Sequence, residues 1–358
     1  MAAYSAHRFA VIGTGAMAAA MMSTFHRAGV HVSAINSRDP ERGRRFAAAF
    51  GIPRTSEDLE SLLKSDEFDA VYIANASADH ASAAIASLDA GKAVLCEKPL
   101  SLAMTDAEKV AEVAARTGRL CMEGLWIPFL PAYRRFVELA RANSCGQPSH
   151  LFADFGYPVS DKTTPRLFAP AAGGVLLDRG IYLVALALDI FGPVENVDSR
   201  FAFTARGLDQ HASLQLLHRG GGQSQLAASF NSLMSNTATL ACSEGIIRLE
   251  EPLIGAEVVS TRRVDVAPRV PREPLQPSNL RQKIMRGLRQ RPLLRRIKRA
   301  VPSTRREHLG YGLDPYLPQL LHFLSLLDSG ASASDLVPLD LSLSIQRVIA
   351  QARKGEPR

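Results

Sequence analysis

The stretch VIGTGAMA, Val11–Ala18, decides the fold, because it joins an apolar run directly to a helix-forming run through a glycine-rich turn. The apolar run, Arg8–Gly13, is typical of a buried strand, and Ala16–Ala28 has the composition of a helix. Within the Gly-x-Gly-x-x-Ala spacing, Gly13 permits a tight turn and Gly15 lets the backbone come close to a ligand. The stretch therefore predicts a strand–turn–helix unit that opens a larger fold.

The helix after this turn begins with free backbone N–H groups, which attract phosphate. We therefore interpret the turn as a dinucleotide-binding site, and a merely structural turn is the alternative. The residues expected to contact the dinucleotide here are Gly13, Thr14, Gly15, Ala16 and Met17.

The rest of the first third alternates apolar runs with amphipathic stretches. Further strands are predicted at His31–Asn36, Ala70–Ala74, Ala93–Cys96 and Arg119–Glu123. Helices are predicted at Pro40–Phe50, Ser56–Leu63, His80–Ala90 and Ser101–Thr117. Continuous apolar strands between helices indicate a parallel sheet covered on both faces. We expect residues 1–125 to form a Rossmann dinucleotide-binding domain, which makes the fold class α/β.

After about Trp126 the strands alternate polar and apolar residues. These runs are His150–Tyr157, Ser199–Ala205, His211–His218, Ser224–Ser232, Thr237–Ser243 and Gly245–Glu250. One helix, Gly174–Ile190, lies among them, and two helical stretches close the chain. Several strands with a helix on one side describe an α+β domain with an open, mostly antiparallel sheet, expected over residues 126–358.

Charge is distributed unevenly along the 358 residues. The chain carries +7, but residues 262–308 hold 15 Lys and Arg against three acids, a net of +12 that leaves −5 elsewhere. Within this basic insert, Arg281–Val301 spaces apolar residues helically among cations. This pattern is typical of a segment on an anionic membrane surface or an acidic partner, and a solvated excursion is the alternative. Specific nucleic-acid binding is not expected, because no aromatic residues interleave the cations.

Other composition features narrow the class of protein. No apolar run approaches the roughly 18–20 residues that span a bilayer. The N-terminal stretch lacks a basic region before its apolar part, so a signal peptide is not expected. The four cysteines are scattered without the paired spacing of a metal site. We expect a cytoplasmic protein with reduced thiols and no metal, with peripheral membrane attachment as an alternative location.

The end of the second predicted strand distinguishes the two nicotinamide dinucleotides. An NAD site usually places an acid there for the ribose diol, whereas this chain has Asn36, Ser37 and Arg38. A small hydroxyl followed by arginine suits a 2′-phosphate, which the guanidinium meets with several donors. We therefore expect NADP, with NAD as a second possibility and a solvent-exposed Arg38 without a role as the alternative.

Three further stretches carry a family resemblance: AGKAVLCEKPLS (Ala90–Ser101), MEGLW (Met122–Trp126) and GGVLLDRGIY (Gly173–Tyr182). Together with the glycine-rich turn they resemble the Gfo/Idh/MocA family. The resemblance implies hydride transfer at a carbohydrate or related alcohol carbon. It also implies a second domain that binds a small carbohydrate-like substrate and supports a homo-oligomer, a dimer or a tetramer.

The resemblance gives Lys98 the role of the catalytic lysine in the family's Glu-Lys-Pro motif. A lysine at the carboxyl end of a parallel strand lies in the crevice where ligands bind, so it can exchange the proton of a hydroxyl that is oxidised. A cis Lys98–Pro99 bond would turn the lysine sharply towards the cofactor. Glu97 is expected to orient this turn beside the cofactor rather than to react.

Asp178 and Tyr182 are four residues apart in the predicted helix, so we expect them on one helix face. Tyr182 would assist Lys98 or hydrogen-bond the substrate oxygen, and Asp178 would bind a substrate hydroxyl. The alternative for Tyr182 is a structural hydrogen bond to a backbone carbonyl. Four further residues are expected in the site: Ala74 and His80 beside the cofactor, and Trp126 and Arg166 beside the substrate.

These predictions describe an NADP(H)-dependent oxidoreductase that acts on a sugar, a sugar derivative or a cyclic diol. A dihydrodiol dehydrogenase-like or xylose dehydrogenase-like activity is an alternative within the same resemblance. A non-catalytic protein that senses a nucleotide is an alternative of another class.

Overall fold

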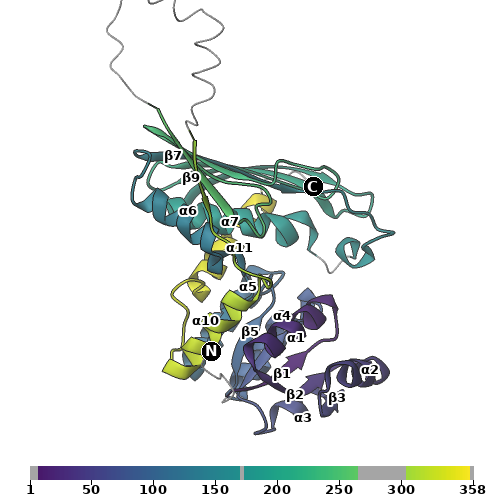
Figure 1. Cartoon of the computed structure of the whole chain (residues 1–358). Helices are drawn as coiled ribbons and strands as arrows, with labels where there is room; N and C mark the ends of the chain where they lie inside the picture. Colours follow the sequence, from purple (N-terminus) through teal and green to yellow (C-terminus); the bar gives the residue numbers. More distant parts are fainter. Residues whose placement is uncertain (1–6, 170–172, 265–303, 355–358) are drawn as a thin grey trace, which may run out of the picture.

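The computed structural model describes residues 7–169, 173–264 and 304–354. Its strands form two sheets, one of six strands in the first third of the chain and one of eight strands in the remainder (Figure 1). The predicted fold class is confirmed: a Rossmann-type parallel sheet is followed by a mostly antiparallel one.

The first sheet has the strand order β3-β2-β1-β4-β5-β6, with every pair parallel. Its strands are β1 Arg8–Ile12, β2 His31–Asn36, β3 Arg54–Ser56, β4 Ala70–Ile73, β5 Ala93–Cys96 and β6 Cys121–Glu123. The direction in which successive strands are added reverses between β1 and β4. Parallel sheets of this kind bind ligands at such a reversal, in the crevice outside the carboxyl ends of the strands.

Helices cover both faces of this sheet, because successive strand residues point to opposite sides. Phe9 packs with Phe25 of α1 at a ring-centroid distance of 4.9 Å, while the next residue, Ala10, lies in a second core cluster. That second cluster contains buried residues of α3, α4 and α5. The helices are α1 Ala16–Ala28, α2 Pro40–Phe50, α3 Leu59–Leu63, α4 His80–Asp89 and α5 Met104–Thr117, with a 3₁₀ turn at Ser77–Asp79.

The main differences from the sequence prediction in this half concern three elements, one of which is α5, a helix that begins at Met104 and not at Ser101. Strand β3 was not expected, because Arg54, Thr55 and Ser56 form a short polar run without strand periodicity. Helix α3 begins later than predicted, because the Asp58 carboxylate accepts hydrogen bonds from the backbone N–H groups of Glu60 and Ser61 and caps the helix.

The second sheet has the order β14-β13-β12-β11-β7-β10-β9-β8, and only the β7–β10 pair is parallel among the described strands. Its strands are β7 Pro148–Gly156, β8 Val194–Phe203, β9 Asp209–His218, β10 Gln223–Ser229, β11 Ala238–Cys242, β12 Gly245–Leu249, β13 Val258–Arg263 and β14 Thr304–His308.

The two ends of the basic insert predicted over residues 262–308 lie in described strands. Arg262 lies in β13 and pairs with Thr304 of β14, so both ends of the segment belong to the sheet. The amphipathic stretch Arg281–Val301 lies outside the described residues.

Helices cover one face of the second sheet (Figure 1). They are α6 Pro131–Arg141, α7 Ile181–Phe191 and α11 Leu339–Lys354, while α10 Leu317–Ser329 packs on α1. Helix α11 contacts both α5 and α7, so the end of the chain bridges the two halves. Short 3₁₀ helices lie at Ile127–Phe129 and Pro165–Phe168. Within the described ranges, no helix has the length and apolar character needed to cross a bilayer.

Candidate active site

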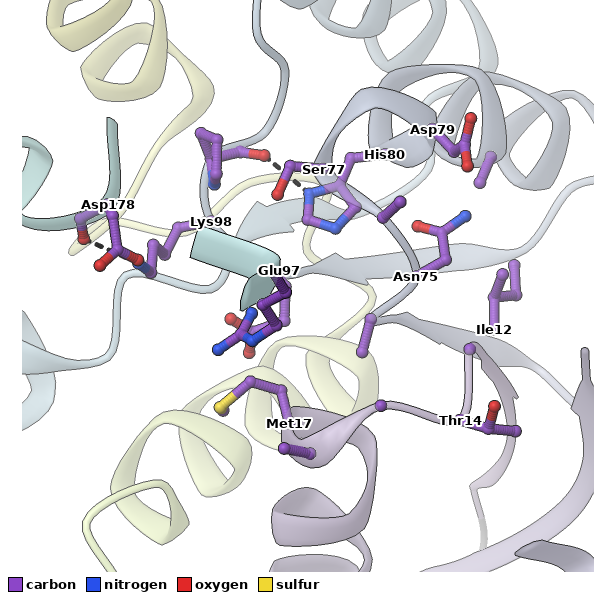
Figure 2. A pocket seen from close by; sticks show the side chains of 18 of the residues that line it. Ile12, Thr14, Met17, Asn75, Ser77, Asp79, His80, Glu97, Lys98 and Asp178 are labelled. Carbon is purple, nitrogen blue, oxygen red and sulfur yellow. Dashed lines mark hydrogen bonds and ion pairs between the residues drawn. The ribbon is translucent and has the colours of Figure 1, made fainter. Parts of the chain in front are cut away.

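A cavity of about 1060 Å³ lies where the carboxyl ends of the parallel strands face the second sheet. One end is lined by the turn after β1 and by the residues that follow β2, β4 and β5. The other end is lined by residues from β7, the Pro165–Phe168 turn, α7 and Tyr316. Figure 2 shows this cavity, with Thr14 and Met17 on one side and Lys98 and Asp178 on the other.

The glycine-rich turn has the conformation that its sequence predicts. Gly13 has a φ of +109°, and a Cβ atom there would lie 2.5 Å from the carbonyl oxygen of Ala74. Only glycine fits this position, because other residues rarely adopt such a φ and the carbonyl occupies the space. Helix α1 starts directly after Gly15 without a side-chain cap, so its first N–H groups remain for a ligand.

The segment after β2 brings two arginines to the cavity. Arg38 lines it and forms an exposed ion pair with Asp79 at 3.1 Å. Arg42, which the sequence analysis did not single out, donates a hydrogen bond to the carbonyl oxygen of Thr14 at 3.0 Å. The carboxylate of Asp39 is engaged as the cap of α2, where it accepts from the backbone N–H of Arg42. The sequence could have indicated Arg42 as a cofactor-side residue, because it lies four residues after Arg38 on the first turn of the predicted helix Pro40–Phe50.

Lys98 and Asp178 form the central pair of the cavity. The Lys98 Nζ atom lies 2.8 Å from Oδ1 of Asp178 and 2.8 Å from its backbone carbonyl oxygen. The Lys98–Pro99 bond is cis. Burial alone would raise the pKa of Asp178, but the charge and hydrogen bond of Lys98, aided by Arg179 and Arg166, hold it below its ordinary value. Asp178 therefore remains ionised opposite the lysine.

The helix that carries Asp178 is not a uniform α-helix as predicted. Leu176–Gly180 forms a π-helical turn, and α7 begins only at Ile181. The uniform α-helical geometry of the prediction does not hold here, but residues four apart in a π-turn still lie on nearly the same side, and both Asp178 and Tyr182 line the cavity. A π-turn widens the helix locally and is frequent at functional sites.

The start of this turn is fixed by a residue from β9. The Asp209 carboxylate accepts a hydrogen bond from the backbone N–H of Leu176 at 2.8 Å and pairs with Arg353 at 3.3 Å. A Cβ atom on Gly174, which has a φ of +77°, would collide with this carboxylate. The double glycine thus lets Asp209 cap the segment that presents Asp178.

Tyr182 is buried beside the Lys98–Asp178 pair, 5% exposed. Its ring centroid lies 5.3 Å from the Lys98 Nζ atom, within the range of a cation–π contact. Burial and then the negative charges of Glu97 and Asp178 raise the pKa of Tyr182 well above its ordinary value. The phenol therefore keeps its proton and is available as a hydrogen-bond donor.

Two buried acids hold the segment around Lys98 in place. Glu97 accepts a hydrogen bond from the Tyr72 hydroxyl at 2.7 Å, and Glu123 accepts from the backbone N–H of Leu100 at 2.7 Å. Burial raises the pKa of both carboxyl groups. Glu97 thus points to Tyr72, and its role in orienting the turn stays a prediction.

His80 supports the same turn from α4. Its Nδ1 atom lies 2.7 Å from the Pro99 carbonyl oxygen, and Figure 2 shows the ring beside Ser77 in the cavity wall. Burial lowers the pKa of His80, so the neutral ring donates through Nδ1 to an oxygen that can only accept. His80 therefore positions the Lys98–Pro99 turn and also lines the cofactor end.

Aromatic side chains form the other end of the cavity. Trp126 packs against Tyr316 with ring centroids 5.2 Å apart, and both line the cavity with Phe155 and Tyr157. Arg166 also lines this end, so the structure brings both predicted substrate-side residues into the cavity. The sequence did not identify Tyr316 as a site residue. It lies about 190 residues after Trp126, directly before α10, and no local motif marks it.

Comparison with known proteins agrees with this arrangement. Residues 7–125 match the family described as "Oxidoreductase family, NAD-binding Rossmann fold", and residues 133–248 match its "GFO/IDH/MocA C-terminal domain". Trans-1,2-dihydrobenzene-1,2-diol dehydrogenase from Oryctolagus cuniculus is 31% identical over 62% of this chain and 68% of its own length. The Mus musculus enzyme of that name is 29% identical over 70% of this chain and 77% of its own.

Solved structures show the same fold. KijD10, a 3-ketoreductase from Actinomadura kijaniata in complex with NADP and TDP-benzene, has a TM-score of 0.76 at 23% identity, covering 98% of this chain and 97% of that one. Aldose-aldose oxidoreductase from Caulobacter crescentus, complexed with glycerol, has a TM-score of 0.75 at 22% identity, covering 98% of both chains. With both halves matched by the family descriptions, the chain belongs to the Gfo/Idh/MocA family of oxidoreductases.

Proposed function

We propose that this protein transfers a hydride between NADP(H) and a carbinol or carbonyl carbon of a sugar, a sugar derivative or a cyclic diol. The observation that carries the proposal is the Lys98–Asp178 pair, which lines the same cavity as the Gly13–Met17 turn. A dinucleotide held at the turn and a substrate beside Lys98 would share one enclosed space. The turn, the uncapped start of α1 and Arg42 fit the phosphates of such a cofactor.

Lys98 is proposed as the acid and base. A lysine ammonium has three N–H donors, and Asp178 accepts from Nζ through its carboxylate and its backbone carbonyl. The third donor is then left for a substrate oxygen. In reduction Nζ gives this proton to the oxygen of the carbonyl that becomes an alcohol; in oxidation the neutral amine takes it back.

Tyr182 and Asp178 are proposed as assistants in this proton transfer. Bound NADP(H) supplies or accepts the hydride. The Tyr182 phenol keeps its proton beside Lys98, so it would donate a second hydrogen bond to the substrate oxygen. Asp178 would hold the lysine amine in place and bind a neighbouring substrate hydroxyl.

NADP is proposed over NAD because of the groups after β2. Arg38 and Arg42 both line the cavity there; Asp39, which follows Arg38 in the chain, is occupied with capping α2, while Arg38 forms an exposed pair with Asp79 at 3.1 Å. A 2′-phosphate would meet two guanidinium groups, each able to form charge-assisted hydrogen bonds. Dissociation constants for NADP⁺ and NAD⁺ test this preference directly, and tighter binding of NAD⁺ would reverse it.

A dihydrodiol dehydrogenase-like activity is the second candidate, and the aromatic wall favours it. Phe155, Tyr157, Trp126 and Tyr316 offer apolar ring faces to a flat substrate, and curated relatives carry that name. A xylose dehydrogenase-like activity remains within the same proposal. Turnover of NADP⁺ and NADPH with aldoses, keto-sugars, inositols and aromatic dihydrodiols would separate these activities. NADPH binding without turnover of any compound would favour a nucleotide-sensing protein instead.

We also propose a homo-oligomer formed through the second sheet. Phe152 and Leu217 are exposed on the sheet, 43% and 38% respectively. Replacing Phe152 by glutamate should dissociate an assembly of this kind, as measured by light scattering coupled to gel filtration. Attachment of Arg281–Val301 to anionic membranes is a separate proposal, for which co-sedimentation with anionic vesicles is the test.

A further inference from the structure

Charged side chains gather at the substrate end of the cavity, and one cation there, Arg166, has no ion-pair partner among the described residues. The Asp178 carboxylate faces Lys98 at 2.8 Å and Arg179 Nε at 3.9 Å. Arg166 also lies close enough for its charge to lower the pKa of Asp178. One carboxylate is thus shared by three cations.

Arg179 is poorly compensated despite being among the largest fully buried side chains, 1% exposed. Its Nη1 atom donates to the carbonyl oxygens of Tyr157 and Ser229, and its guanidinium stacks 3.7 Å from the centroid of the Tyr157 ring. Among the described residues, Nε and Nη2 have no hydrogen-bond partner. Burial lowers the pKa of Arg179, which reflects the unfavourable desolvation of this charge. Its positive field is therefore only partly cancelled by Asp178.

Arg166, like Lys98, is a cation of this group that a ligand can reach, whereas Arg179 does not line the cavity. It lies exposed on the Pro165–Phe168 turn and lines the cavity between Thr164 and Leu167. In the part of the chain that the structure describes, it forms no ion pair. Arg206, by contrast, pairs with Asp161 at 3.2 Å and does not line the cavity.

The acids that line this end of the cavity do not pair with Arg166. Only Glu97 and Asp178 lie beside Lys98; Asp39, Glu57 and Asp79 lie at the cofactor end. Asp178 pairs with Lys98, and Glu97 points to the Tyr72 hydroxyl and not to an arginine. The guanidinium of Arg166, which has no ion-pair partner among the described residues, would therefore be met by a negative charge on the substrate.

We propose that the substrate of this oxidoreductase carries a carboxylate or a phosphate, and that Arg166 binds that group while the reacting oxygen lies beside Lys98. The proposal rests on the function proposed above and specifies its substrate class. The remaining wall at this end is largely apolar, with Phe155, Tyr157 and Val159. An anionic handle at one end and a reacting hydroxyl at the other would therefore orient a compact substrate in one direction.

Matched sets of substrates test this proposal with the full-length chain. Glucose, glucuronate and glucose 6-phosphate share a ring but differ in charge, and glycerol and glycerate form a smaller neutral and charged pair. Turnover is measured with NADP⁺, and binding to the NADP⁺ complex is measured from the emission of Trp126, the single tryptophan, which lines the cavity. We expect the charged member to be favoured about tenfold or more in kcat/KM or in affinity, since one charge-assisted contact is of that order. Comparing glucuronate with glucose 6-phosphate shows whether the site prefers a carboxylate or a phosphate.

Arg166→Gln should reduce the ratio of charged to neutral substrate towards one, whereas Arg206→Gln, which changes an arginine outside the cavity, should leave the ratio as it is. A preference for the neutral member, or a ratio unaffected by Arg166→Gln, would overturn the inference while leaving the proposed oxidoreductase function intact. A chain that binds NADPH but turns over none of these compounds would count against the proposed function; the binding ratio from Trp126 emission would still decide the charge of the ligand.

Discussion

Replacing Asp178 by asparagine removes the negative charge beside Lys98 while keeping the size of the side chain. In the native protein the lysine amine bonds both to this carboxylate and to the backbone carbonyl of the same residue, each at 2.8 Å. A hydrogen bond with a charged partner contributes about 1.5–3 kcal/mol. Because the backbone bond remains and the amide oxygen still accepts, we expect a loss near the lower limit. That loss corresponds to about a 10- to 30-fold decrease in kcat/KM.

The assay for Asp178→Asn combines two measurements. Steady-state consumption of NADPH gives kcat/KM with the best carbonyl substrate of the panel, and quenching of Trp126 emission by NADPH gives the dissociation constant of the cofactor. We expect that constant to change by less than about twofold, because Asp178 lies on the substrate side of Lys98 and away from the phosphate turn. The expected result is therefore a slower enzyme with an intact cofactor site.

A matched control is Asp106→Asn, which removes a carboxylate from an exposed pair with Lys109 at 3.3 Å on the surface of α5. Exposed pairs contribute little, so kcat/KM should stay within about twofold of the native value. If Asp178→Asn turned over substrate as fast as the native protein, the assigned role of the pair would be refuted. If the affinity for NADPH fell by the same factor as kcat/KM, Asp178 would act by maintaining the structure of the site and not by positioning Lys98.

Three further predictions concern the cofactor turn and acid stability. Arg42→Ala should weaken NADP⁺ binding about tenfold while changing NAD⁺ binding little, since only NADP⁺ carries a 2′-phosphate; equal effects on both dissociation constants would contradict this. Gly13→Ala should abolish saturable NADPH binding, because its Cβ would meet the Ala74 carbonyl at 2.5 Å; native affinity in titrations would contradict the geometry. In the unfolded chain the Asp178 carboxyl has its ordinary pKa of 3.8, and in the folded protein its pKa is lower. The ionised carboxylate therefore stabilises the fold fully above pH 3.8, and this contribution to the unfolding free energy is lost as the pH falls through the pKa of the folded protein. Below pH 3.8 the native protein should therefore lose unfolding free energy more steeply than Asp178→Asn in urea titrations; identical slopes would contradict this.

The parts of the site that could be predicted from the sequence are those encoded locally. The turn at Gly13 depends on a few consecutive residues whose conformational limits are known from their type. The alternation of strands and helices likewise predicted the parallel sheet, because burial on both faces makes each strand continuously apolar.

The parts that could not be predicted depend on contacts between distant segments. Strand β14 is a run of charged residues that becomes a strand only by pairing with β13. Tyr316 and Asp209 reach the site through the packing of elements far away in the sequence. The buried position of Arg179 opposes the usual preference of arginine for solvent. Carbonyl oxygens at the ends of two strands, an aromatic stack and the Asp178 carboxylate stabilise it there.

The central claim is that Lys98 exchanges the proton during hydride transfer, and Lys98→Met tests it most directly. Methionine keeps the length and apolar character of the side chain but offers no proton. With the best substrate of the panel, we predict that turnover falls by about 10³-fold or more, while the NADPH dissociation constant from Trp126 emission stays within about threefold. A Lys98→Met protein that retained native turnover would contradict the account.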